Sequence, residues 1–140
     1  MARSCMADSK IVKEWLAKAE EDFNFAKINL EEDNKFYSQI CFHFQQSAEK
    51  YLKAYIYAYD LEFEKIHNLV ALLKICGKRD APLLSLMEQC ELLSTAYIDT
   101  HYPVHWPTNY SKEKTQKMQV AASKIAHAVK EILEKGGISR

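Results

Sequence analysis

Apolar residues recur every three or four positions over most of this chain, which is the spacing of one face of an α-helix. The first stripe lies within residues 9–32 and comprises Val12, Trp15, Leu16, Ala19, Phe23, Ala26 and Leu30. A second stripe lies within residues 36–60 and comprises Phe44, Ala48, Tyr51, Leu52 and Tyr55. Two long helices are therefore predicted, separated by a turn at Asp33-Asn34.

Glycine and proline positions divide the rest of the chain. A short helix over residues 66–76 is predicted to end at Gly77, a residue that favours the left-handed cap conformation. A third long helix begins near Asp80 and tolerates Pro82 in its first turn. Two more prolines exclude a regular helix over residues 100–110, and the last helix runs from a Ser111 cap to the glycines at 136 and 137. Its apolar stripe comprises Met118, Ala121, Ala122, Ile125, Val129, Ile132 and Leu133.

Four long amphipathic helices with short connections predict an all-α fold, an antiparallel up-down four-helix bundle. The short helix adds one element between the second and third long helices. No alternating strand pattern competes with this arrangement. Residues 9–136 are predicted to form a single domain, with a flexible leader at 1–8 and a flexible tail at 137–140.

Composition fits a globular protein and excludes some partners. The 140 residues are 48% hydrophobic and 27% charged, and the formal net charge is zero. A global basic surface for nucleic acid is therefore missing, while a local basic patch stays open as an alternative. We expect no membrane span and no secretory leader, hence a cytoplasmic protein. The four cysteines form no Cys-x-x-Cys pair and are expected to be reduced, three of them as small core residues: Cys41, Cys76 and Cys90.

Polar residues flank the apolar face of the second helix at helical spacing. Gln45, Glu49 and Lys53 follow one another every four residues, and Gln46 and Lys50 form the adjacent line. A surface helix has no general need for paired glutamines beside a Glu-Lys pair in its most aromatic stretch. This combination resembles the second helix of HEPN domains, small helical proteins often encoded beside minimal nucleotidyltransferases.

Two further blocks strengthen the resemblance. HEPN proteins of this type carry His-x-Leu near the start of a short helix, which His67-Asn68-Leu69 matches. They also carry Tyr-x3-Arg-Tyr-Pro, and residues 97–103 read Tyr-Ile-Asp-Thr-His-Tyr-Pro, with His101 in place of the arginine. Together the blocks cover residues 10–135.

The resemblance implies a helical partner of a separately encoded minimal nucleotidyltransferase, in a toxin–antitoxin-like pair, with a nucleotide or RNA as ligand. The alternatives are a ribonuclease toxin and a plain dimeric scaffold. HEPN ribonucleases use an Arg-x4-6-His motif without metal, but no arginine of this chain precedes a histidine at that spacing. His101 and His105 are the nearest catalytic candidates, so a non-catalytic or weakly catalytic module is favoured over an enzyme.

The segment around the two prolines concentrates aromatic rings and histidines. Such rings can stack on bases, although they can equally seal the end of the bundle. His101 and His105 are four apart, but Pro103 between them argues against a helical metal site, and no cofactor is expected. The predicted ligand-binding surface comprises Glu49, Lys53, His67, Tyr97, His101, Tyr102 and Trp106. The alternative is that the glutamines and Glu49 fix packing across helices while the lysines are solvated.

Apolar side chains also lie outside the predicted core. Phe25 and Ile28 point away from the first stripe, and the second helix carries more tyrosines than one core face needs. This excess predicts a homodimer.

Overall fold

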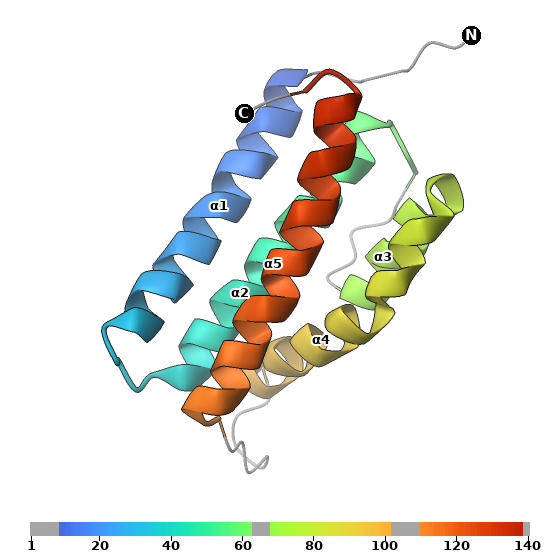
Figure 1. Cartoon of the computed structure of the whole chain (residues 1–140). Coiled ribbons are helices and arrows are strands. Elements are labelled where there is room, and N and C mark those ends of the chain that lie inside the picture. The colour runs from blue at the N-terminus through green and yellow to red at the C-terminus, as the bar shows by residue number, and fades with distance from the viewer. Residues whose placement is uncertain (1–8, 63–67, 102–109, 139–140) are drawn as a thin grey trace, which may run out of the picture.

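The computed structural model describes residues 9–62, 68–101 and 110–138, with the backbone alone at 97–101. Its helices are α1 (Ser9–Glu31), α2 (Tyr37–Ala58), α3 (Leu69–Arg79), α4 (Met87–His101) and α5 (Lys112–Lys135), with a 3-10 helix, η1 (Ala81–Leu86), before α4 (Figure 1). These ranges contain no strand, so the all-α prediction with a short extra helix is confirmed.

Helix α2 is the central element of the bundle. It contacts α1, α3, α4 and α5, whereas α1 packs on α2 and α5, on the side away from α3 and α4 (Figure 1). The stretch from Phe44 to Ile56 is therefore buried over most of its circumference. A helix enclosed in this way is normally apolar all round, yet this stretch buries four polar side chains: Gln45, Ser47, Glu49 and Lys53.

The stripes predicted for the first and last helices are confirmed. In α1 they supply five buried residues, with Trp15 and Phe23 half-buried against them. In α5 all predicted core positions are buried or packed against the core. Ser111 caps α5 by accepting a hydrogen bond of 3.0 Å from the backbone N–H of Lys114, as predicted.

The prediction that Gly77 caps the short helix is wrong. Helix α3 begins at Leu69, where the Asn68 side chain accepts a hydrogen bond from the Ala71 N–H at 3.1 Å, and it continues past Gly77 to Arg79. A Cβ at position 77 would lie 2.4 Å from Cδ2 of Leu84 in η1. The glycine is there for close packing between α3 and η1, and its backbone is not left-handed.

The third long helix also differs from its prediction. Residues 81–86 around Pro82 form a 3-10 helix, and the α-helix begins at Met87. Proline lacks the N–H that a regular helix would use, and 3-10 turns are common at such starts. Helix α4 extends through Thr100 to His101, so the prediction of irregular chain from residue 100 was wrong by two residues. Residues 102–109 lie outside the described part.

The C-terminal end of α5 confirms one prediction and corrects another. Gly137 adopts φ 100° and ends the helix, with its N–H donated to the Glu134 carbonyl at 3.1 Å. The Ile138 N–H reaches back to the Leu133 carbonyl at 2.9 Å, which completes a Schellman motif. Ile138 is only 4% exposed, so the predicted flexible tail is wrong at this residue, because the motif folds it onto the core.

The three predicted core cysteines are buried free thiols. Burial raises the pKa of Cys76 and of Cys90 to about 12, so both thiols stay protonated at neutral pH. Their role as small apolar residues is confirmed.

Candidate functional site

Four side chains on the middle of α2 form a continuous hydrogen-bonded chain, which we call the polar row: Gln45, Gln46, Glu49 and Lys53. The Gln46 Nε2 donates to Gln45 Oε1 at 2.8 Å, and Gln45 Nε2 donates to Glu49 Oε1 at 3.4 Å. Lys53 Nζ donates to Glu49 Oε2 at 2.8 Å. These three bonds run along one helix.

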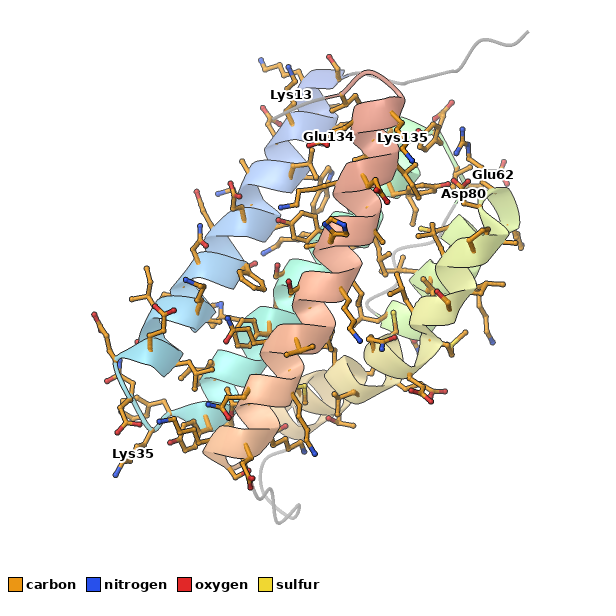
Figure 2. All side chains as sticks on the ribbon, viewed as in Figure 1. Lys13, Lys35, Glu62, Asp80, Glu134 and Lys135 are labelled. Carbon is orange, nitrogen blue, oxygen red and sulfur yellow. The ribbon has the colours of Figure 1, made fainter. Side chains whose placement is uncertain are left out.

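The charged members of the polar row are buried. Glu49 is 3% exposed and Lys53 is 9% exposed, although lysine and glutamate are among the residues least often found inside proteins. The expectation of a solvated Lys53 is therefore wrong. By contrast, Lys13, Lys35 and Lys135 lie on the outer surface of the bundle (Figure 2).

Two aromatic rings stand beside the lysine end of the polar row. Lys53 Nζ lies 5.5 Å from the centroid of the Trp15 ring on α1. Trp15 in turn stacks on Tyr57, with centroids 5.7 Å apart and planes 17° apart, and both side chains are half-buried. Amide groups, a charge pair and flat rings thus lie together, which suits a planar ligand with polar edges.

A second charged cluster joins α1 to α2. Asp22 accepts a hydrogen bond from His43 Nδ1 at 3.1 Å and another from Lys50. Burial raises the pKa of Asp22, but the hydrogen bonds from His43 and Lys50 outweigh burial and the net pKa is below its usual value. Sequence reasoning missed Asp22, although the seven-residue spacing of His43 and Lys50 places both on one face of α2.

A third polar cluster closes the end of α3 against α2, where Asp80 lies (Figure 2). Asp80 accepts hydrogen bonds from the Tyr55 hydroxyl and, at 2.7 Å, from Arg79 Nη1. Burial and the Asp80 carboxylate raise the pKa of Tyr55. The Arg79 guanidinium lies 3.4 Å from the centroid of the Tyr59 ring. The one arginine in the described ranges therefore serves this contact.

A hollow of the described surface lies elsewhere, between α4 and α5. It has a volume of about 600 Å³ and is lined by Glu88, Gln89, Leu92, Glu113, Gln116, Lys117, Val120, Ala121 and Lys124. Gln89 Oε1 is buried without a hydrogen-bond partner and borders this groove. No member of the polar row lines this groove.

The predicted ligand-binding residues divide into two groups. Glu49 and Lys53 are brought together, as described above. For Tyr97 and His101 the structure gives only the backbone, in the last two turns of α4. His67, Tyr102, His105 and Trp106 lie outside the described residues, so the aromatic part of the site stays a prediction. The described side chains contain no group of three metal-ligating residues, and no described helix has the length and apolarity to cross a membrane.

Comparison with known proteins identifies the family. The family model of the HEPN domain matches residues 12–134, almost the whole chain. This chain belongs to the HEPN domain family. The match spans all the described helices apart from the first turn of α1 and the last residue of α5, and it confirms the resemblance carried by the polar row of α2.

A solved structure agrees with this HEPN assignment at the level of the fold. The crystal structure of an archaeal HEPN homologue superposes with a TM-score of 0.70 and covers 91% of this chain and 98% of its own. At 24% sequence identity this likeness extends to the fold alone. No curated protein matches the chain.

Proposed function

We propose that this HEPN domain is a binding module, a non-catalytic partner of a separately encoded minimal nucleotidyltransferase that binds a nucleotide at the polar row. The observation that carries the proposal is the burial of Glu49 and Lys53 in the central helix. A buried ion pair gives little net stability, because desolvation offsets the attraction between the charges. A polar row of this kind in an otherwise apolar stretch is typical of a site kept for function.

The charge balance of the polar row limits the ligand. Glu49 neutralises Lys53 at 2.8 Å, so the pair offers little net attraction to a phosphate group. Recognition is therefore assigned to the base, whose edges match the amide groups of the glutamines and whose ring matches Trp15 and Tyr57. Phosphate binding is assigned to His101. The attraction between an imidazole and a phosphate group strengthens as the imidazole protonates, which for an unperturbed group happens near or below about pH 6.5.

The ribonuclease alternative has less support. Of the chain's three arginines, Arg3, Arg79 and Arg140, none precedes a histidine by the family spacing. The described one, Arg79, is hydrogen-bonded to Asp80 and Tyr55. We expect no appreciable RNA cleavage by the purified protein. Cleavage lost in His101→Ala or His105→Ala would reverse this ranking, whereas cleavage that survives both changes indicates a contaminant.

A nucleotide titration followed by NMR tests the site. We expect ATP to shift the indole N–H signal of Trp15 and the amide signals around Gln46, more strongly at the lower of two pH values. Gln46→Ala should weaken binding severalfold, whereas Gln39→Ala, an exposed glutamine on the same helix, should not. No shifts at millimolar ATP, or shifts confined to other helices, would leave the dimeric scaffold as the better reading.

Partner binding is tested separately. The proposal expects a minimal nucleotidyltransferase frame adjoining this gene, and co-expression of both chains should yield a stable complex on size-exclusion chromatography. If neither holds, the nucleotidyltransferase partnership fails, while nucleotide binding at the polar row is decided by the titration alone.

A further inference from the structure

The groove between α4 and α5 has no role in the proposed function, and we call it the α4–α5 groove. It lies beside the first half of α5 and has a volume of about 600 Å³ (Figure 1). Its apolar lining consists of Leu92 from α4 and of Val120 and Ala121 from α5, and Val120 is 55% exposed. Ligand pockets have volumes of about 300–1,000 Å³, so the groove can hold several residues of a peptide.

One wall of the α4–α5 groove holds a polar atom that the fold leaves unsatisfied. Among the residues that the structure describes, Gln89 Oε1 is the one buried side-chain oxygen or nitrogen atom without a hydrogen-bond partner. Such atoms are rare in proteins, because they lose their hydrogen bonds to water and gain none in return. Gln89 lines the groove, and the last torsion of a glutamine side chain turns readily, so a donor in the groove can meet this oxygen. The groove therefore suits a ligand that brings an N–H or O–H donor.

The rim of the α4–α5 groove carries two carboxylates and two ammonium groups: Glu88, Glu113, Lys117 and Lys124. All four residues are exposed, and none forms an ion pair within the described ranges of the chain. Their charges sum to zero, so the groove has no excess positive charge for a nucleic acid or for the phosphates of a nucleotide. A ligand that carries charges of both signs matches this rim.

The spacing of the charges along α5 sets the length of that ligand. Glu113 and Lys124 are separated by three turns of helix, which at 1.5 Å per residue is about 16 Å. An extended chain spans about 3.3–3.6 Å per residue, so about five residues cover this distance. A helical ligand would use its backbone N–H groups internally, whereas an extended segment leaves them free for Gln89 Oε1. The Gln116 amide on the α5 wall offers the peptide groups of such a segment a second partner.

We propose that the α4–α5 groove binds a short extended segment of a partner protein, about five residues long. A basic side chain at one end pairs with Glu113, an apolar side chain in the middle packs on Val120, and an acidic side chain at the other end pairs with Lys124. A backbone N–H of the segment donates to Gln89 Oε1. No residue of the polar row lines this groove, so the proposal does not rest on nucleotide binding.

Titration with a pentapeptide, followed by NMR, tests the groove. The probe is Lys-Ala-Leu-Ala-Glu with an acetylated N-terminus and an amidated C-terminus, so that only its side chains are charged. It should shift the amide signals around Gln89 and Val120, with half-saturation at about 1 mM or below. Gln89→Leu should weaken binding about fivefold or more. The same variant should raise the midpoint of thermal unfolding by about 2–4 °C, because it removes the unsatisfied oxygen.

Charge reversal distinguishes a specific contact from nonspecific association. Lys124→Glu should weaken binding of this probe about threefold to fivefold, because the acidic end of the peptide then meets a like charge. It should strengthen binding of the blocked peptide Lys-Ala-Leu-Ala-Lys by a similar factor. The matched control is Lys135→Glu, a reversal of an exposed lysine in the last turn of α5 and outside the groove, which should leave both affinities unchanged (Figure 2).

Three outcomes would overturn the proposal. The first is the absence of shifts at the groove with either peptide at about 10 mM. The second is equal affinity of the wild type, Gln89→Leu and Lys124→Glu for the probe, because the peptide would then lie on another surface. The third is a shift of the groove signals by ATP and not by the peptides, which would make the groove a nucleotide site. Nucleotide binding at the polar row is followed separately, by the indole N–H signal of Trp15, so failure of one proposal leaves the other to its own test.

Discussion

Lys50 and Lys53 are neighbours on α2, and each is paired with a carboxylate. The carboxylate lies on another helix in the first pair and on the same helix in the second. Lys50 reaches across to Asp22 on α1, and the two side chains are 26% and 16% exposed. Lys53 reaches back to Glu49 on its own helix, and these side chains are 11% and 4% exposed. The pair that joins two helices is thus the wetter one, and the drier pair lies within one turn of α2.

This difference in burial changes what each pair contributes to folding stability. The Asp22–Lys50 pair, with His43, fixes the register of α1 against α2 and keeps part of its hydration. An intrahelical pair such as Glu49–Lys53 adds only about 0.2–0.5 kcal/mol to a helix in water. Burying it costs several kcal/mol per ion before the two charges attract each other. A gain in folding stability therefore explains the presence of the Asp22–Lys50 pair, but it does not explain the presence of the Glu49–Lys53 pair.

Removing the lysine of the buried pair should have the largest effect. Lys53→Met leaves the Glu49 carboxylate buried beside an apolar side chain, and we expect the free energy of unfolding to fall by about 3–5 kcal/mol. Urea denaturation followed by circular dichroism measures this change. The control Lys124→Met, on the exposed face of α5, should stay within about 0.5 kcal/mol of the wild type.

The double variant Glu49→Leu/Lys53→Met sharpens this result. With both charges replaced by apolar side chains, no unpaired charge remains, so stability should recover most of the loss. The shortfall comes from Gln45 Nε2, which is buried and loses its Glu49 acceptor. The double variant should nevertheless lose nucleotide binding. A single Lys53→Met cost below about 1 kcal/mol would contradict the view that this pair is desolvated.

Breaking the inter-helix cluster should cost less. Asp22→Asn keeps the shape of the side chain but removes the charge that accepts from His43 and Lys50, so we expect a loss of about 1–2 kcal/mol at pH 7. Urea denaturation measures it again. Glu32→Gln, an exposed carboxylate directly after α1, is the matched control and should show no comparable loss.

The Asp22 effect should also depend on pH. The folded pKa of Asp22 lies below its usual value of 3.8 because the two hydrogen bonds outweigh burial. The contribution is therefore fully present above the unfolded pKa and is lost as the pH falls through the folded pKa. The difference between wild type and Asp22→Asn should persist from neutral pH down to about pH 4 and shrink below it. If the stability difference between wild type and Asp22→Asn grew on acidification, the result would contradict a lowered pKa of Asp22.

The helices could be predicted from the sequence because their signals are local. The core stripes of α1 and α5 and the Ser111 cap depend on spacing and on residues a few positions apart. The role of Gly77 could not be predicted in this way. Its buried position depends on Leu84 in the next element, so a glycine that looks like a helix end is a packing contact.

The candidate site was predictable in composition but not in environment. The glutamines, Glu49 and Lys53 were recognisable as an unusual set, yet their burial follows from the central position of α2, which no local pattern encodes. Asp22 was missed for the same reason. Its hydrogen-bond partners, His43 and Lys50, lie on another helix, 21 and 28 residues away in sequence.

Salt should give the smallest effect and separate the two pairs directly. The Debye length falls from about 10 Å at 0.1 M to about 3 Å at 1 M ionic strength, which screens charges that water reaches. Raising NaCl over this range should reduce the cost of Asp22→Asn by a few tenths of a kcal/mol, because that cluster is partly hydrated. The cost of Lys53→Met should not change, because the buried pair is little screened. General effects of salt on apolar burial act on wild type and variant alike and cancel in each difference. If salt reduced the stability cost of both substitutions equally, water and ions would have to reach the polar row. The burial that distinguishes Glu49 and Lys53 from Asp22 and Lys50 would then not hold in solution.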